Sequence, residues 1–242
     1  MLPKHIDKLD SLRLSKNGTY EPMETACVKL LLKPGQTFVD IGAHIGYYTL
    51  LAAEIVGPKG RVFAFEPDPE NFALLEANIK AAGVEEYVVA VNAAIGLNHG
   101  GKSELYLSRT NSGDHRLFAT PGRTHVEVPV LALDRYLSYG DVDFIKCDTQ
   151  GYEWAVLAGA RNLLQKCPAK IYMLVEFYPS GLCLSGSSGA NLLALLEELG
   201  FHYSIPRMGR VAVRADEVLN LFPDSTARHT NLLCYRETER LK

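Results

Sequence analysis

The turn from Gly42 to Gly46 is the first place in the sequence where residue types and spacing suggest chemistry. It follows an apolar run, and in a doubly wound sheet a glycine-rich turn at that point lets the backbone approach a ligand closely. A dinucleotide site typically needs Gly-x-Gly-x-x-Gly, whereas this turn reads Gly-x-x-x-Gly and has His44 where the second glycine would be. The Cβ atom of His44 would crowd a pyrophosphate. The turn therefore favours a ligand without phosphates, such as S-adenosylmethionine, with a plain strand-to-helix turn as the alternative.

Glu66 is the second polar residue that directly follows an apolar run. An acidic residue at this place accepts hydrogen bonds from ribose hydroxyls. Nicotinamide enzymes use an acid there too, so Glu66 alone discriminates little between S-adenosylmethionine and a nicotinamide dinucleotide as the ligand. A solvated strand end is the structural alternative.

Asp148 follows the apolar run 142–147 and precedes an expected helix, which places it at the same edge as the glycine turn. It could act as a general base, bind a metal, bind the amino group of the cofactor, or simply cap the helix. Glu176 could join Asp148 around a hard cation. Strand-end acids are more often solvated or paired with Arg, so no metal site is predicted.

Three further polar residues are candidates near this edge. His115 could be lowered onto the substrate by a loop, although a surface histidine is equally compatible. Asn111 could contact the substrate or the methionine carboxylate, but asparagine before Ser-Gly is also favourable turn chemistry. Glu153 could be catalytic, but an acid in the first helical turn is also favoured by the helix dipole.

The elements that would position these residues alternate between strand and helix. The expected strands are 37–41, 61–65, 87–91, 142–147 and 170–177, and the expected helices are 23–32, 47–56, 69–82, about 152–165 and 190–199. Three terminal strands are expected at 201–205, 210–214 and 231–236. This order predicts the α/β class, with a parallel sheet that helices cover on both faces.

The organisation is that of one domain with an arm and an insertion. The alternating segments 102–107 and 126–130 break the strand–helix pattern and predict an insertion at about 97–130, near the sheet edge. Residues 1–22 are interpreted as an N-terminal arm, and residues 23–242 as a single domain.

Composition narrows the class of protein further. The 25 Lys and Arg residues against 28 Asp and Glu residues give a net charge of −3, so no global positive field attracts nucleic acid. No apolar run approaches the roughly 20 residues that span a bilayer, and the charged start does not resemble a signal peptide. The five scattered cysteines fit a reducing compartment. We expect a cytoplasmic protein that acts on a small molecule, without a nucleic-acid partner or a membrane span.

Several motifs in order resemble one family, the FkbM-type S-adenosylmethionine-dependent methyltransferases. They are Tyr20-Glu21-Pro22, residues 38–47, 62–68, 109–113, 126–130 and 142–148. The resemblance covers most of the chain, and a set of ordered motifs is more specific than one glycine turn.

The resemblance implies a Rossmann-like methyltransferase fold with a C-terminal antiparallel strand. The implied reaction moves a methyl group from S-adenosylmethionine to oxygen, often a hydroxyl of a sugar or of a natural product. Gly42 and Gly46 would line the methionine part, Glu66 would hold the ribose, and Asn92 would lie near the adenine. The expected cofactor-binding residues are Glu21, Asp40, Gly42, Ala43, His44, Gly46, Tyr47, Glu66, Pro67, Asn92, Asn111 and Asp148, and the expected catalytic residues are Asp148, His115 and Glu153.

Two positions depart from the family pattern. The family commonly has Asn at the position of His44, and it has Ile-Asp-Val-Glu-Gly where this chain has Cys147-Asp148-Thr149-Gln150-Gly151. Gln150 in place of Glu keeps a catalytically inactive binding module as an alternative. A methyltransferase that acts on a carboxylate acceptor is a further alternative function.

Overall fold

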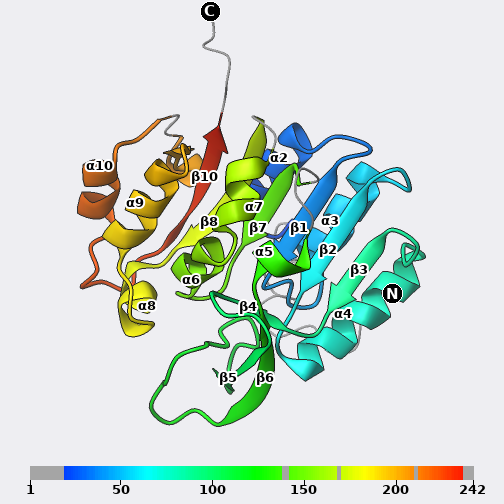
Figure 1. Cartoon of the computed structure of the whole chain (residues 1–242), viewed down its shortest axis with the longest axis horizontal. Coiled ribbons are helices and arrows are strands. Elements are labelled where there is room, and N and C mark those ends of the chain that lie inside the picture. Colours follow the sequence, from blue (N-terminus) through cyan, green and yellow to red (C-terminus); the bar gives the residue numbers. More distant parts are fainter. Residues whose placement is uncertain (1–18, 138–141, 168–169, 210–211, 237–242) are drawn as a thin grey trace, which may run out of the picture.

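The computed structural model describes residues 19–137, 142–167, 170–209 and 212–236, and a central sheet runs through it (Figure 1). Its seven strands follow the order β3-β2-β1-β7-β8-β10-β9. These strands are β1 (Thr37–Ile41), β2 (Arg61–Phe65), β3 (Val88–Val91), β7 (Phe144–Cys147), β8 (Ile171–Phe177), β9 (His202–Ser204) and β10 (Thr230–Arg236).

The strand order reverses between β1 and β7. From that point β2 and β3 lie on one side and β8 on the other, and all five strands are parallel. β10 is antiparallel to both β8 and β9. The predicted α/β fold with a C-terminal antiparallel strand is therefore confirmed, and the crevice beyond the carboxyl ends of β1 and β7 is where such a sheet binds its ligand.

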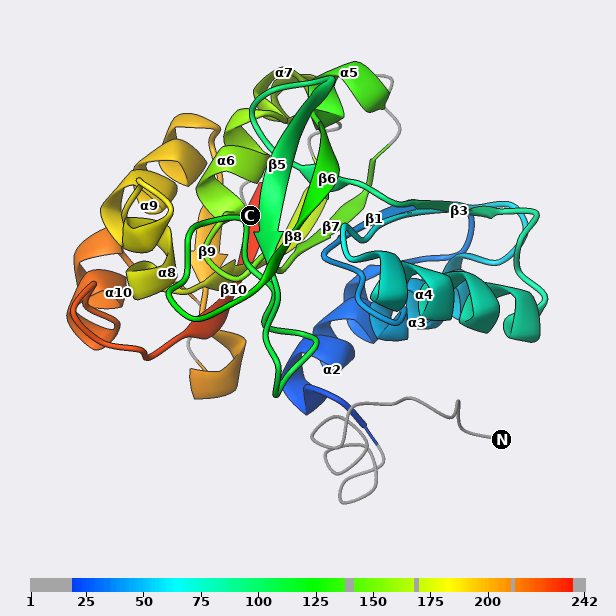
Figure 2. The ribbon, with the colours of Figure 1, turned by 90° about the horizontal axis from the view of Figure 1, so that it is seen from below.

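Helices cover both faces of the sheet, as Figure 2 shows edge-on. One face packs against α2 (Pro22–Leu31), α3 (Tyr47–Val56) and α4 (Pro69–Ala82). The other packs against α6 (Glu153–Ala158), α7 (Arg161–Lys166), α9 (Gly189–Glu198) and α10 (Ala215–Leu221). Two short helices, α5 (Leu133–Tyr136) and α8 (Pro179–Leu184), and the 3-10 turn η1 (Pro206–Met208) complete the described helical elements.

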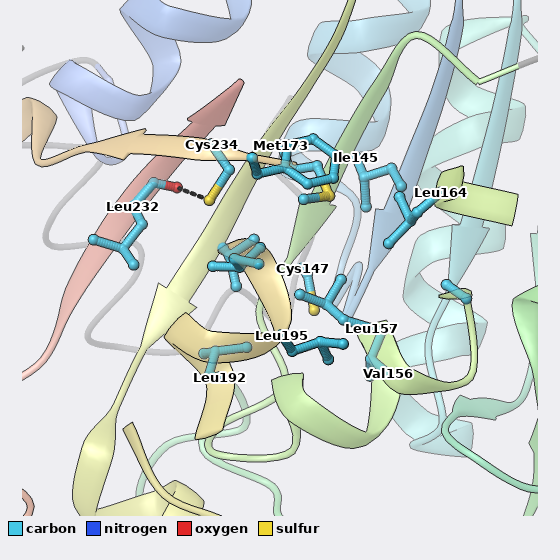
Figure 3. Close-up of a cluster of buried hydrophobic side chains, with 14 of the residues drawn as sticks. Ile145, Cys147, Val156, Leu157, Leu164, Met173, Leu192, Leu195, Leu232 and Cys234 are labelled. Carbon is cyan, nitrogen blue, oxygen red and sulfur yellow. Dashed lines mark hydrogen bonds between the residues drawn. The ribbon is translucent and has the colours of Figure 1, made fainter. Parts of the chain in front are cut away.

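Alternation along β7 divides its side chains between these two faces. Phe144 belongs to the core cluster on the α2–α4 face, whereas Ile145 and Cys147 belong to the cluster on the α6–α9 face. Figure 3 shows Ile145 and Cys147 among the apolar side chains of that second cluster. Lys146 must therefore point to the same face as Phe144, towards α2 and α3.

Local signals explain why several elements have the predicted bounds. Asp68 accepts a hydrogen bond from the Asn71 N–H at 2.9 Å, Pro69 follows it, and Gly83 ends α4 in the left-handed conformation. Helices 47–56 and 69–82 and strands 37–41 and 61–65 are confirmed at the predicted residues.

The expected insertion forms a second, three-stranded sheet in the order β4-β6-β5. It consists of β4 (Ala94–Ile95), β5 (Gly101–Tyr106) and β6 (His125–Leu131), and the loop from β5 to β6 contacts the turn after β1 and helix α4 through Ser112. Residues 1–18 of the expected arm lie outside the described residues. The division into arm, domain and insertion stays a prediction.

Two predicted elements were wrong in detail. The helix expected over 152–165 is divided into α6 and α7 at Gly159 and Ala160, where the backbone passes so close to Gly96 that a Cβ atom on Gly159 would lie 2.1 Å from the Gly96 carbonyl oxygen. The Asp134 carboxylate then caps α7 by accepting the N–H groups of Asn162 and Leu163. In the expected strand 210–214, residues 212–214 are not in a strand, and 210–211 lie outside the described residues.

Candidate active site

Strand register places the candidate residues side by side at the carboxyl edge of the sheet. Ile41 pairs with Cys147, and Cys147 pairs with Val175. Gly42 and Asp148 directly follow β1 and β7, and Glu176 is the second-last residue of β8, so the three residues meet at the carboxyl edge of three adjacent strands. A cavity of about 600 Å³ opens at this point.

Of the sequence-predicted residues, this cavity is lined by Glu21, Asp40, Gly42, Ala43, His44, Tyr47, Asn111 and Asp148. Further lining residues that the sequence reasoning did not assign to the site include Tyr48, Arg116, Lys146, Arg207 and His229. The sequence reasoning thus located the edge of the sheet but missed most of the charged wall around it.

Backbone conformation independently marks the same cavity. Among the described residues, the non-glycine residues with positive φ are Glu21, His44 and Gln150, at 42°, 53° and 54°. All three line the cavity. Such conformations cost free energy and concentrate at functional sites. Asparagine adopts this region readily, so the family's Asn at the position of His44 fits the same backbone.

Gly42 is required by the close approach of two strand ends. Its φ is +80°, and a Cβ atom there would lie 1.9 Å from the Asp148 carbonyl oxygen. The Asp148 N–H donates to the Ile41 carbonyl at 3.0 Å, which joins the glycine turn to the end of β7. Gly46 begins α3 and faces Leu75 instead of the cavity. Its role is therefore to let the turn pack on α4.

Glu66 lies in a smaller adjoining pocket of about 60 Å³, which shares Gly42, His44 and Asp148 with the large cavity. Its carboxylate accepts the His44 N–H at 2.8 Å and the Asp68 N–H at 2.9 Å. Burial raises the pKa of Glu66 to about 7. The pocket is otherwise mostly apolar, so a carboxylate beside an apolar surface suits a nucleoside.

A loop covers this smaller pocket. Ser112 contacts the His44 Nε2 atom through its hydroxyl at 2.8 Å and accepts the Asn71 side-chain amide at 3.1 Å through its carbonyl. The pocket holds room for only a few water molecules.

His115 belongs to the covering loop and lines the smaller pocket, together with Pro67. Its Nδ1 atom accepts the Ser108 N–H at 3.0 Å, and its Nε2 atom lies 3.9 Å from the Asp68 carboxylate. Burial lowers the pKa of His115. The structure therefore places His115 on the Glu66 side of the site, away from Glu176.

Asn92 and Glu153 line neither pocket. The Asn92 amide donates to the carbonyl oxygens of Glu66 and Pro67, so it holds the backbone at the end of β2. Glu153 is fully buried and accepts the N–H groups of Thr149 and Gly151. This placement does not support the catalytic role that the sequence suggested for Glu153, because its carboxylate is occupied in shaping the turn after β7.

Lys146 is the most informative residue that the sequence reasoning missed. Its side chain is only 2% exposed, and its ammonium lies 2.7 Å from the Asp148 carboxylate and 4.0 Å from that of Glu21. It also sits 5.0 Å from the centre of the Tyr48 ring. Burial by itself would lower the pKa of Lys146, but Asp148, Glu21 and Tyr48 together raise it well above its usual value. A lysine inside the apolar strand 144–147 was the signal in the sequence.

Asp148 and Glu176 differ in charge although they are neighbours. Burial favours the neutral form of both, but the Lys146 ammonium and hydrogen bonds from the surrounding side chains lower the pKa of Asp148. For Glu176, burial and the nearby carboxylates of Asp148 and Glu153 raise the pKa well above its usual value. At neutral pH the negative charge therefore resides on Asp148.

The start of α2 closes one side of the cavity. Glu21 accepts a hydrogen bond from the Tyr48 hydroxyl at 2.9 Å and forms an ion pair with Arg207 at 3.0 Å. Asp40 lies behind them, where it accepts the Thr49 hydroxyl at 2.7 Å. Burial raises the pKa of Asp40 to about 6. Within the described residues, no group of three His, Cys, Asp or Glu side chains is arranged to hold a metal ion.

Comparison with solved structures identifies the fold. A SAM-dependent O-methyltransferase from Thermotoga maritima superimposes with a TM-score of 0.52 at 15% identity, covering 96% of this chain and 71% of that chain. An rRNA methylase from Streptococcus thermophilus superimposes with a TM-score of 0.51 at 11% identity, covering 89% and 95%. At these identities the likeness shows the fold alone, which is that of S-adenosylmethionine-dependent methyltransferases.

The family follows from the sequence match. Residues 40–203 match the model of the methyltransferase FkbM domain, and the chain belongs to this family. The resemblance seen in the motifs is thereby confirmed, and S-adenosylmethionine is the cofactor. The hexuronic acid methyltransferase AglP of Haloferax volcanii is 26% identical over 194 residues, which cover 77% of this chain and 73% of that protein.

In the described part of the chain, no helix has the length and apolar character needed to cross a membrane. The expected absence of a nucleic-acid partner stays a prediction.

Proposed function

We propose that this methyltransferase acts on a hydroxyl group of a small-molecule acceptor, and that the acceptor lies in the large cavity next to Asp148. S-adenosylmethionine supplies an electrophilic methyl group on a sulfonium, which transfers by in-line displacement. We propose that the Glu66 side chain binds the ribose of the cofactor and that the turn from Gly42 to His44 binds its methionine part. Asp148 lines both pockets, which supports a position for it between cofactor and acceptor.

One observation carries the choice of a hydroxyl over a carboxylate. Within the described lining of the cavity, every Lys and Arg side chain already pairs with a carboxylate: Lys146 with Asp148, Arg116 with Asp114, and Arg207 with Glu21 and Glu24. A carboxylate acceptor would meet no unpaired cation there and would be repelled by Asp148. A neutral hydroxyl would meet hydrogen-bond acceptors instead.

Asp148 is suited to receive the proton that a hydroxyl loses. It is ionised at neutral pH because Lys146 is 2.7 Å away. The low pKa makes Asp148 a weak base. A weak base suffices here, because an alcohol oxygen becomes strongly acidic as it gains the methyl group, so its proton leaves readily in the transition state.

The test uses the full chain, methyl-labelled S-adenosylmethionine and acceptors that separate the two chemistries. A methyl hexoside offers only hydroxyls, a hexuronic acid offers both groups, and a simple carboxylic acid offers no hydroxyl. Methyl ethers survive mild base, whereas methyl esters are cleaved. We expect base-stable product from the first two acceptors. Base-labile product from the second and third would contradict the proposal.

Asp148→Asn tests the proton acceptor, because it keeps the size of the side chain and removes its charge. With saturating cofactor, turnover should fall by about a hundredfold to ten-thousandfold, the usual contribution of positioned proton transfer. Asp143→Asn is the matched control. Asp143 lies before the opposite end of β7, where it accepts the Thr37 N–H at 2.9 Å, so this variant should retain turnover. An unchanged rate for Asp148→Asn would refute the role.

A carboxylate acceptor is the second candidate. The relative AglP is named for hexuronic acid, a substrate class that carries a carboxylate as well as hydroxyls. For such an acceptor, turnover of Asp148→Asn would remain near that of the wild type, because no proton has to be removed.

A further inference from the structure

The side-chain amide of Gln150 lies between two acids in the wall of the cavity. Its Nε2 atom donates to Asp148 Oδ1 at 2.9 Å and to the Glu176 carboxyl oxygens at 3.2 and 3.1 Å. Its backbone N–H also donates to Glu176 at 3.2 Å. All three residues line the cavity, so the amide joins two carboxyl groups next to the proposed acceptor position.

Building on the proposed function, we propose that Gln150 is a positioning residue that holds Asp148 and Glu176 as one pair with a single negative charge. Two adjacent carboxylates in a buried site do not both ionise unless something compensates their charge. The primary amide of Gln carries two N–H donors, so one side chain can bridge both acids. The amide thus occupies the place that a cation would take between two ionised carboxylates.

The surrounding charges decide where the single negative charge resides. Lys146 donates to Asp148 Oδ2, which is the oxygen that Gln150 leaves free. The other titratable groups that act on the pair are Asp40 of β1, Cys147 of β7 and Glu153 of α6, all of them buried. Glu21 lies beyond Lys146 and acts on the pair through it. Among these groups Lys146 is the cation, and it favours Asp148 over Glu176 as the ionised member.

This arrangement predicts what a third carboxyl group would do. In Gln150→Glu, a carboxylate would replace the amide donor that faces Asp148 and Glu176, so three carboxyl groups would converge with the proton of Glu176 as the remaining donor between them. Oxygen ligands of this kind are those that hard divalent cations bind. The variant should therefore need a cation that the wild type does not need.

The experiment compares the full-length wild type with three variants in calorimetric titrations with MnCl₂ and MgCl₂ and in thermal melting, all without acceptor. Gln150→Glu should melt about 5 °C or more below the wild type, and Mn²⁺ should restore the melting temperature with a Kd below about 1 mM. Gln165→Glu adds the same charge on the exposed side of α7 and should behave as the wild type, with no saturable binding.

The third variant exchanges the two groups. Gln150→Glu combined with Glu176→Gln keeps two carboxyl groups and one amide, so it should melt within about 3 °C of the wild type and lose the Mn²⁺ response. In single turnovers, Gln150→Glu should be rescued at least about tenfold by Mn²⁺, while EDTA leaves the wild type unchanged.

Two results would overturn the inference. The first is a Gln150→Glu protein that melts like the wild type and binds no cation. The second is an exchange variant that fails to fold or still binds Mn²⁺. Either outcome would show that Gln150 does not act by limiting the negative charge on Asp148 and Glu176. The titration and melting need no acceptor, so a failure to methylate any hydroxyl would overturn the proposed function and leave this test intact.

Discussion

Replacing Lys146 by Met tests whether a buried ion pair sets the charge of the active site. The Lys146 side chain is 2% exposed and lies 2.7 Å from Asp148. Removing one partner of a buried pair leaves the other charge uncompensated, which typically costs about 3–5 kcal/mol. Methionine keeps the apolar stem, so little packing is lost. We expect the free energy of unfolding at pH 7 to fall by about 3–5 kcal/mol, which most folded domains survive.

The stability lost in Lys146→Met should depend on pH in a predictable direction. In the wild type the pKa of Asp148 is lowered, so its contribution is complete above the unfolded value of about 4 and disappears as pH falls through the folded pKa. The pKa of Lys146 is raised, so its contribution is complete below the unfolded value of about 10.4 and disappears as pH rises through the folded pKa. The contributions of Asp148 and Lys146 to the free energy of unfolding are therefore both complete at pH 5–8. Without Lys146 the pKa of Asp148 rises, so the deficit of Lys146→Met should shrink from pH 7 to pH 5.

Urea unfolding at pH 5, 6, 7 and 8 would measure this for Lys146→Met, Asp148→Asn and the double variant. The double variant should be about 2–3 kcal/mol more stable than the sum of the single losses predicts, because it removes both charges. Lys102→Met is the control, since its ion pair with Glu127 has a similar length of 2.6 Å but is exposed, so its removal should leave the free energy of unfolding nearly unchanged. Additive losses, or a loss below about 1 kcal/mol for Lys146→Met, would refute the reasoning.

Three further outcomes follow from the site. Gly42→Ala should abolish S-adenosylhomocysteine binding in calorimetry and lower the melting temperature more than Gly35→Ala. Both glycines have φ near +80°, but only at Gly42 would the new Cβ atom lie 1.9 Å from the Asp148 carbonyl oxygen, whereas the space at Gly35 is open. Glu66→Gln should weaken that ligand about tenfold to a hundredfold. Because the folded pKa of Glu66 is raised to about 7, its ionisation destabilises the protein as pH rises from about 4.5 to 7, and Glu66→Gln should lessen that decline. His44→Asn keeps the left-handed backbone but loses the contact with Ser112, so hydrogen exchange in residues 108–116 should accelerate while the melting temperature changes little.

The elements around the cofactor turn were predictable because their signals are local. Gly35, Gly57 and Gly83 interrupt the apolar runs, and the Asp68-Pro69 pair begins a helix, so strand and helix bounds follow from adjacent residues. The division between α6 and α7 lies instead where Gly159 approaches Gly96, and these two residues are far apart in the sequence. No pattern within the segment 152–165 reports that contact.

The residues of the candidate site likewise fall into those that local sequence patterns predict and those that they do not. Strand ends in a parallel sheet meet at one edge, so Glu66 and Asp148 were found from their positions after apolar runs. Lys146 was missed because a residue inside a buried strand is expected to pack, and no local pattern reports its approach to Glu21, which was expected at the site only from the family resemblance. Arg207 was missed for the same reason, since it reaches Glu21 from the turn η1.

The residues of the site come from parts of the fold that differ in rigidity. The strand ends supply Gly42, Asp148 and Glu176 from the sheet, whose register holds them rigidly, whereas Glu21 comes from the start of α2 and Ser112 from a loop. Precise geometry is needed at the reacting atoms, because methyl transfer depends on alignment. Entry and release need groups that can move, and ion pairs or single hydrogen bonds to α2 and the loop can break and reform. The sheet thus supplies Lys146, Asp148 and Glu176, whereas other sides of the cavity are formed by the contacts of Glu21 with Tyr48 and Arg207 and of His44 with Ser112.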